Sequence, residues 1–156
     1  MVRPAMADAA PQRVLLVEDN PDHTYLTELV LEGADVPHEI VHAVDGQEAV
    51  DWLRGTGAHA GPPFLPALVL LDLKLPRVDG FQVLRVMRAD PTLRLVPVVI
   101  LTTSNNPADI EQSLALGASD YVIKPIGLNE FERKLCGVLR YWLSVSDLGR
   151  GRPDRP

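Results

Sequence analysis

The sequence predicts an α/β fold in which a doubly wound, five-stranded parallel sheet carries helices on both faces. Four short runs are apolar at every position and rich in β-branched and aliphatic residues, which is typical of strands buried on both faces of a parallel sheet. The segments between them carry apolar residues at helical spacing, so strands and helices alternate along the chain. The length of 156 residues, with 46% hydrophobic and 23% charged residues, suits one globular domain.

Five segments are predicted strands. The four apolar runs are Val14–Val17, Leu68–Leu71, Val98–Leu101 and Tyr121–Ile123. A fifth segment, Glu39–Val44, is less hydrophobic. We therefore expect it at an edge of the sheet, where a strand is less completely covered.

The first two predicted helices follow the first strand and the edge strand. The helix Pro21–Glu32 ends before Gly33, which we expect to be its C-cap. Asp45 and Glu48 have the spacing of a capping box, in which each side chain accepts a hydrogen bond from the other residue's backbone N–H. This pattern predicts a helix that begins after Asp45 and continues through Trp52.

Three further helices complete the alternation. Apolar residues repeat on one face from Phe81 onward, and that helix is predicted to stop near Asp90. Pro107 opens the next helix, which stops before Gly117. The last helix is long, and its apolar stripe consists of Leu128, Phe131, Leu135, Val138 and Trp142.

Glycine and proline divide the chain into one domain with short flanks. We expect a flexible head at residues 1–12, the folded domain at residues 13–143, a flexible tail at residues 144–156, and no output domain. Residues 55–66 hold six of the glycines and prolines. A loop of this length is uncommon in a compact domain and often has a function.

Charge and cysteine content argue against several classes of protein. The net charge of −6 makes a nucleic-acid-binding surface unexpected. The single cysteine, Cys136, cannot form an internal disulfide, so nothing indicates an oxidising compartment. No apolar run approaches the roughly 20 residues of a membrane span, and the N-terminus lacks the apolar segment of a signal peptide. We expect a cytoplasmic protein with no membrane partner.

Polar side chains follow the strands at the end of the sheet where such folds bind ligands. Glu18 and Asp19 come directly after the first strand and Asp72 after the third. Thr102 and Lys124 follow the last two strands. Three carboxylates, a hydroxyl and an ammonium group are therefore expected to converge.

Three carboxylates held a few ångströms apart repel one another by roughly 4 kcal/mol per pair at an effective dielectric of 20. A divalent cation would offset this repulsion, and an all-oxygen site suits Mg²⁺. Attack by a free carboxylate oxygen on phosphorus would form an aspartyl phosphate. Lys124 and Thr102 could then bind phosphoryl oxygens, because phosphoryl transfer depends mainly on positioning and charge neutralisation.

The residues around these positions form four motifs. They are the segments Val14–Asn20, Leu70–Gly80, Ile100–Thr103 and Asp120–Pro125. In this combination and order they closely resemble the receiver domain of bacterial two-component response regulators, over about residues 13–143. The resemblance implies a flavodoxin-like, receiver-type fold.

The resemblance also implies roles for individual residues. Asp72 would be the phospho-acceptor, and Lys124 would bind the phosphoryl group, with a cis bond to Pro125. The ligands of Mg²⁺ or Mn²⁺ would be Glu18, Asp19, Asp72 and the backbone carbonyl of Lys74. Thr102 would be the switch hydroxyl, and Tyr121 the aromatic side chain that follows its movement.

Two side chains depart from what is common in such receivers. Lys74 lies two residues past the acceptor, and Ser104 lies two residues past Thr102. Because residues at these places are linked to the rate of dephosphorylation in the family, the lifetime of the phosphorylated state is left open.

The resemblance implies a signalling module and not a metabolic enzyme. It would take a phosphoryl group from the phosphohistidine of a sensor histidine kinase, hydrolyse it slowly, and signal through protein contacts. The loop 55–66 and the lack of an output domain resemble the small receivers that partner phytochrome-type histidine kinases. Leu139, Tyr141 and Leu143 widen the apolar stripe of the last helix, which predicts a homodimer through the last strand and helix.

Two other functions compete with this interpretation. A phosphatase or phosphotransferase of the haloacid-dehalogenase type would also use Asp72, but it needs a second aspartate where Lys74 stands. A flavodoxin-like cofactor binder would place phosphate after the first strand, where Glu18 and Asp19 would repel it. His38 and His42 lie four residues apart without a nearby third ligand, so a zinc site is not expected.

Overall fold

The computed structural model describes residues 12–62, 64–124 and 127–150, with side chains as far as residue 143. Its strands are β1 (Gln12–Val17), β2 (His38–Ala43), β3 (Leu68–Leu71), β4 (Val98–Thr102) and β5 (Asp120–Ile123). Its helices are α2 (Pro21–Glu32), α3 (Gly46–Arg54), α4 (Gly80–Ala89), α5 (Pro107–Ala115) and α6 (Leu128–Arg150), with a short 3₁₀ turn, η1 (Gly57–His59).

All five strands form one parallel sheet in the order β2-β1-β3-β4-β5. The predicted fold class is therefore confirmed, including the edge position of β2. β1 begins at Gln12, two residues earlier than predicted, because Gln12 and Arg13 pair with His38 and Glu39 of the edge strand. Because Gln12 and Arg13 are polar, a prediction based on apolar runs alone does not include them in the strand.

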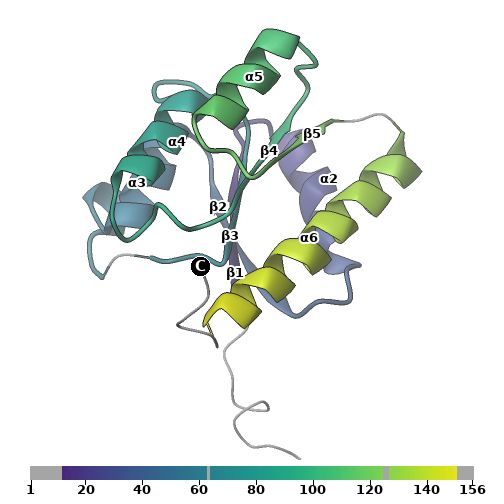
Figure 1. Cartoon of the computed structure of the whole chain (residues 1–156), viewed down its shortest axis with the longest axis horizontal. Helices are drawn as coiled ribbons and strands as arrows, with labels where there is room; N and C mark the ends of the chain where they lie inside the picture. Colours follow the sequence, from purple (N-terminus) through teal and green to yellow (C-terminus); the bar gives the residue numbers. More distant parts are fainter. Residues whose placement is uncertain (1–11, 63, 125–126, 151–156) are drawn as a thin grey trace, which may run out of the picture.

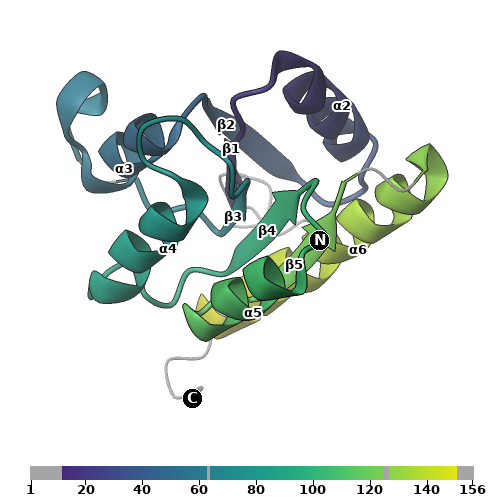
Figure 2. The same cartoon turned by 90° about the horizontal axis from the view of Figure 1, so that it is seen from above.

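Helices cover both faces of the sheet and enclose two apolar cores (Figures 1 and 2). On one face, side chains of α3 and α4 pack against alternate residues of the central strands, such as Leu15 and Val69. On the other face, α2 and α6 pack against the intervening residues, such as Leu16 and Leu70. This alternation follows from the two-residue repeat of a strand, and it explains why the central strands are apolar at every position.

Two predicted helix signals take a different form in the structure. Gly33 is the C-cap of α2, as predicted, but its φ of −80° shows that the position does not require the left-handed conformation that favours glycine. The Asp45 side chain accepts the backbone N–H of Glu48, but Glu48 accepts the N–H of Val44 and not that of Asp45. The predicted capping box is therefore only half present, and a complete one occurs at Asp79–Gln82, at the start of α4.

The long loop at residues 55–66 is packed against α3 and β1. The His59 ring stacks on Trp52 with 3.8 Å between ring centroids, and its Nε2 atom lies 3.0 Å from a carboxylate oxygen of Glu48. Phe64 is buried, with its ring edge toward Trp52 and the Arg13 guanidinium 4.5 Å from its centroid. Aromatic contacts thus hold the described part of this loop in place.

The last helix corrects one predicted boundary. α6 continues past residue 143 to Arg150, so helix occupies part of the segment predicted as a flexible tail. Leu139 and Leu143 are fully buried in the core, and of the three side chains that suggested a second apolar face only Tyr141 is exposed. Most of the predicted head, the residues after Arg150 and the Lys124–Pro125 bond lie outside the described residues. No helix in the described part is long and apolar enough to span a membrane.

Candidate functional site

The candidate site lies at the carboxyl ends of β1 and β3. These adjacent strands mark the point where the strand order reverses, because β1 lies between β2 and β3. Connections on the two sides of such a point diverge to opposite faces and leave room for a ligand. The backbone N–H of Asp72 donates to the carbonyl of Val17, which places Asp72 beside Glu18 and Asp19.

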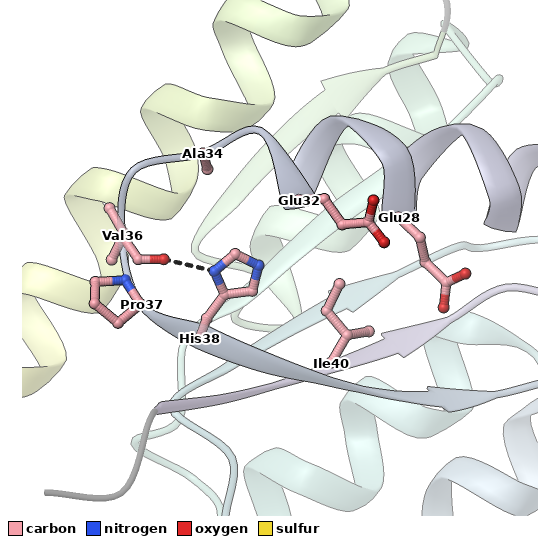
Figure 3. A pocket seen from close by; sticks show the side chains of 7 residues that line it. All are labelled: Glu28, Glu32, Ala34, Val36, Pro37, His38 and Ile40. Carbon is pink, nitrogen blue, oxygen red and sulfur yellow. Dashed lines mark hydrogen bonds between the residues drawn. The ribbon is translucent and has the colours of Figure 1, made fainter. Parts of the chain in front are cut away.

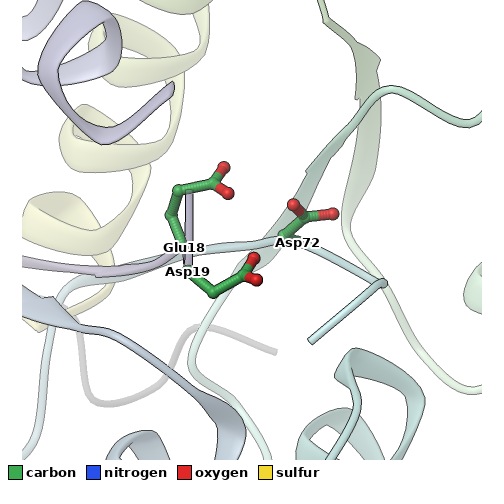
Figure 4. Close-up of side chains that lie close together, drawn as sticks. All are labelled: Glu18, Asp19 and Asp72. Atoms are coloured by element: carbon green, nitrogen blue, oxygen red, sulfur yellow. The ribbon is translucent and has the colours of Figure 1, made fainter. Parts of the chain in front are cut away.

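Three carboxylates gather at this point (Figure 4). One oxygen each from Glu18, Asp19 and Asp72 lies within 4.8 Å of the other two. Glu18 and Asp72 are buried, whereas Asp19 is exposed. The predicted convergence of the three carboxylates is thus present, although β1 and β3 come from distant parts of the chain.

A buried lysine partly neutralises the three carboxylates. The Lys124 ammonium is in hydrogen-bonding contact with Glu18 and lies 3.6 Å from an oxygen of Asp72. Burial raises the pKa of Glu18, and the contact with Lys124 opposes that rise. Since Lys124 is only 5% exposed, the ammonium depends on these partners in place of water.

One further residue at the site was missed by the sequence analysis. The Nδ1 atom of His23 lies 3.2 Å from the Lys124 ammonium and 3.9 Å from an oxygen of Glu18. His23 belongs to the first turn of α2, where Asn20 caps the helix by accepting the backbone N–H groups of Asp22 and His23. The only sequence signal is position, because the first turn of a helix that follows β1 starts beside the carboxyl end of the sheet.

The segment after Asp72 is tightly packed. The backbone N–H of Lys74 donates to Asp72 at 3.3 Å, and the Lys74 side chain is exposed. Gly80, the first residue of α4, donates its N–H to the carbonyl of Leu73. A Cβ atom on Gly80 would lie 2.2 Å from the carbonyl oxygen of Asp72, so the start of α4 can approach the backbone of Asp72 only at a glycine.

The predicted switch residues are linked through Ser104. Thr102 is fully buried at the end of β4, and its hydroxyl accepts the backbone N–H of Ser104 at 3.4 Å. The Tyr121 hydroxyl donates to the Ser104 carbonyl at 2.9 Å, and the Ser104 hydroxyl donates to Asp109 of α5 at 2.6 Å. Partial burial raises the pKa of Tyr121, so the phenol keeps its proton at neutral pH.

The donor set fits a hard divalent cation. Three carboxylates and one ammonium leave an excess of two negative charges. The atoms that the carboxylates offer to a metal ion are all oxygens. Mg²⁺ and Mn²⁺ favour oxygen ligands. Among the described residues, this is the one group of three acidic, histidine or cysteine side chains close enough to hold a metal ion.

A hollow lies between the end of α2 and the start of β2 (Figure 3). It is lined by Glu28, Glu32, Ala34, Val36, Pro37, His38 and Ile40.

His38 bonds to the carbonyl of Val36 at 2.6 Å, whereas His42 lies 2.8 Å from the carbonyl of Glu18. The two histidines thus bind separate backbone groups.

Comparison with known proteins gives one family. The family model of the response regulator receiver domain matches residues 14–135 of this chain. Response regulator Rcp1 of Synechocystis sp. is 36% identical over 138 residues, which cover 88% of this chain and 93% of that protein. The comparisons give no support to the haloacid-dehalogenase alternative, in agreement with Lys74 at the place of a second aspartate.

Solved structures agree with this comparison. The phosphorylated cyanobacterial phytochrome response regulator RcpA is 40% identical, with a TM-score of 0.79 and coverage of 87% of this chain and 96% of that one. The Mn²⁺-bound form of Rcp1 has a TM-score of 0.78 at 36% identity, covering 85% and 95%. The bacteriophytochrome response regulator AtBRR is 42% identical, with a TM-score of 0.68 and coverage of 83% and 95%.

Proposed function

This chain belongs to the response regulator receiver family, and from that premise we propose that it accepts a phosphoryl group on Asp72 from a sensor histidine kinase. The observation that carries this proposal is the position of the Asp72 carboxylate. It is buried, lies 3.6 Å from the Lys124 ammonium, and shares the end of the sheet with Glu18 and Asp19.

The chain's own groups account for the transfer. A carboxylate oxygen of Asp72 attacks the phosphorus of a phosphohistidine, so that an O–P bond forms while the N–P bond breaks and its electron pair leaves with the imidazole nitrogen. Lys124 pairs with the negative oxygens of the phosphoryl group, and the Thr102 hydroxyl donates to another. Hydrolysis of the resulting acyl phosphate returns Asp72 to its free form.

Glu18, Asp19 and Asp72 would hold Mg²⁺ or Mn²⁺, together with the backbone carbonyl of Lys74. When bound, the ion supplies positive charge that neutralises the phosphoryl oxygens. Support for this assignment comes from the excess negative charge of the three carboxylates and from the Mn²⁺-bound relative.

We propose that phosphorylation is communicated through Ser104. When the Thr102 hydroxyl turns toward the phosphoryl group, it releases the backbone N–H of Ser104, whose carbonyl holds Tyr121 and whose hydroxyl holds the first turn of α5. The contacts of Tyr121 and α5 are therefore coupled to the state of Asp72.

The proposed partner is a phytochrome-type histidine kinase, in a light-sensing phosphorelay. Support comes from the relatives, which include a cyanobacterial phytochrome response regulator and a bacteriophytochrome response regulator. We also propose a homodimer through β5 and α6, supported by the exposed Tyr141 on α6. Sedimentation with and without a phosphoryl mimic tests the dimer, and a concentration-independent monomer in both states contradicts it.

The test of phosphoryl acceptance uses Mg²⁺ and acetyl phosphate, a small phosphodonor, with intact mass as the readout. We expect one phosphoryl adduct on the wild type and none on Asp72→Asn. Asp35→Asn is the matched control, since Asp35 is an exposed acid between α2 and the start of β2, and it should be labelled like the wild type. An unlabelled wild type, or an adduct that persists on Asp72→Asn, would contradict the proposal.

A further inference from the structure

We propose that His23 is a positioning residue for phosphoryl transfer: its neutral Nδ1 atom holds the Lys124 ammonium in the site when the carboxylates are engaged elsewhere. This inference rests on the proposed function, because Lys124 matters here as the group that pairs with the phosphoryl oxygens. It assigns a role to a side chain that none of the receiver motifs includes.

The contact has only one possible direction. An ammonium group carries three N–H donors and no acceptor, so the His23 Nδ1 atom, 3.2 Å from Lys124, must accept the hydrogen bond. The imidazole is therefore unprotonated at Nδ1. Among the described residues, the other polar contacts of the ammonium are with two carboxylates, Glu18 directly and Asp72 at 3.6 Å.

Those two carboxylates have other roles in the proposed reaction. Asp72 must present a free oxygen to phosphorus, and Glu18 and Asp72 are both among the oxygen ligands offered to a hard cation. Each carboxylate that turns away leaves the buried Lys124 with fewer acceptors. An imidazole nitrogen competes poorly for Mg²⁺, so His23 remains available to the ammonium.

A neutral acceptor also suits the charge that arrives. A third carboxylate beside Lys124 would hold the ammonium more tightly but would repel the phosphoryl group. His23 is itself held in place, because Asn20 accepts its backbone N–H and its side chain is one-third exposed rather than free in solvent. The ring can thus anchor Lys124 without adding negative charge to the site.

The test compares His23→Leu with His23→Asn. Leucine has a similar size and no acceptor, whereas the asparagine oxygen can take the place of the Nδ1 atom. We expect His23→Leu to lower the rate of labelling by acetyl phosphate at saturating Mg²⁺ by about tenfold, the effect of losing one hydrogen bond to a charged group. We expect His23→Asn to recover the rate to within about twofold of the wild type. His38→Leu, at the other end of the sheet, is the matched control and should be labelled at the wild-type rate.

Two further measurements separate positioning from a structural effect. In the Lys124→Ala background, His23→Leu should cause no additional loss, because its effect acts through Lys124. In metal-free protein, the NMR signal of the Lys124 amino group should shift in His23→Leu and remain near its wild-type position in His23→Asn.

The outcomes distinguish this inference from the proposed function. A labelled wild type with unchanged His23→Leu, or an equal loss in the Lys124→Ala background, overturns the role of His23 alone. Equal losses in His23→Leu and His23→Asn, with an unshifted Lys124 signal, also overturn it. A wild type that takes no phosphoryl group overturns the proposed function and this inference together.

Discussion

Removal of the charge on Asp19 should stabilise the metal-free protein and weaken its stabilisation by Mg²⁺. Asp19 is the exposed member of the carboxylate cluster, so Asp19→Asn removes a negative charge without opening a cavity. In the metal-free protein this change relieves repulsion, whereas in Mg²⁺ it removes a proposed ligand. We expect the variant to be more stable than the wild type in chelator and to gain little from Mg²⁺.

The separations in the site give the size of the effect. At 4.8 Å, the upper limit of the oxygen–oxygen separations in the cluster, two unit charges repel by about 3.5 kcal/mol at an effective dielectric of 20 and about 0.9 kcal/mol in bulk water. The charge of Glu18 is already paired with Lys124, so the repulsion between Asp19 and Asp72 dominates. Because Asp19 is exposed, we expect a gain of about 1 to 2 kcal/mol, which corresponds to a rise in Tm of about 3 to 8 °C.

Thermal unfolding followed by circular dichroism in EDTA and in MgCl₂ measures both effects. For the wild type, Mg²⁺ at about ten times its Kd should stabilise the folded state by about 1.4 kcal/mol. Asp19→Asn should lose most of this Mg²⁺-dependent rise in Tm. Glu39→Gln is the matched control, because Glu39 is an exposed acid near the opposite end of the edge strand β2.

Three results would refute the reasoning about the cluster. The repulsion argument is wrong if Asp19→Asn unfolds at a lower temperature than the wild type in EDTA. It is also wrong if Glu39→Gln gives an equal gain, because the effect would then reflect overall net charge. The assignment of Asp19 as a ligand is wrong if the variant keeps the full rise in Tm with Mg²⁺.

Two remaining predictions concern the elements that support the site. Asp45→Ala should lower the free energy of unfolding by about 1 to 2 kcal/mol at pH 7, because it removes the N-cap of α3. The backbone N–H of Glu48 lowers the pKa of the Asp45 carboxyl. The stability that this cap contributes is therefore fully present above the ordinary pKa of the carboxyl and is lost as pH falls through the lowered pKa. Urea unfolding of the wild type and Asp45→Ala at pH 7 and pH 3 checks this pH dependence, and an equal loss of stability at both pH values refutes it. Gly80→Ala should cost about 1 to 3 kcal/mol and slow labelling of Asp72, because its Cβ would clash with the Asp72 carbonyl oxygen. Gly137→Ala, whose Cβ meets open space within α6, should instead stabilise by about 0.5 to 1 kcal/mol in urea unfolding, and a stable, normally labelled Gly80→Ala would contradict the clash.

Much of the fold was predictable because its central strands are buried on both faces. Burial of this kind leaves an unbroken apolar run, which bounded β3 correctly at Leu68–Leu71. The same signal weakens at the edge of the sheet, where Gln12 and Arg13 belong to β1 although they are polar. The burial of Leu139 and Leu143 in α6 was also not predictable, because it depends on the rotation of the helix about its axis relative to the sheet.

The carboxylate cluster was predictable for a topological reason, but its partners were not. Parallel strands bring all residues that follow them to one edge, so Glu18, Asp72 and Lys124 could be placed together without side-chain detail. The contact between His23 and Lys124 depends instead on one rotamer and on the rotation of α2. A spacing pattern cannot contain that information, since the two residues lie 101 positions apart.

The buried pair of Lys124 and Glu18 is the feature that stability alone does not explain. Both side chains are almost fully buried, and the cost of taking two charges out of water commonly equals or exceeds their mutual attraction. Two apolar residues of similar volume would fill the same space without that cost. The proposed function gives the pair a role: Lys124 would leave Glu18 for the incoming phosphoryl group, and an ammonium already stripped of water would bind a phosphoryl oxygen without a second desolvation. The cost of burying the charge would then fall on folding and not on phosphoryl binding, as expected of a preorganised site.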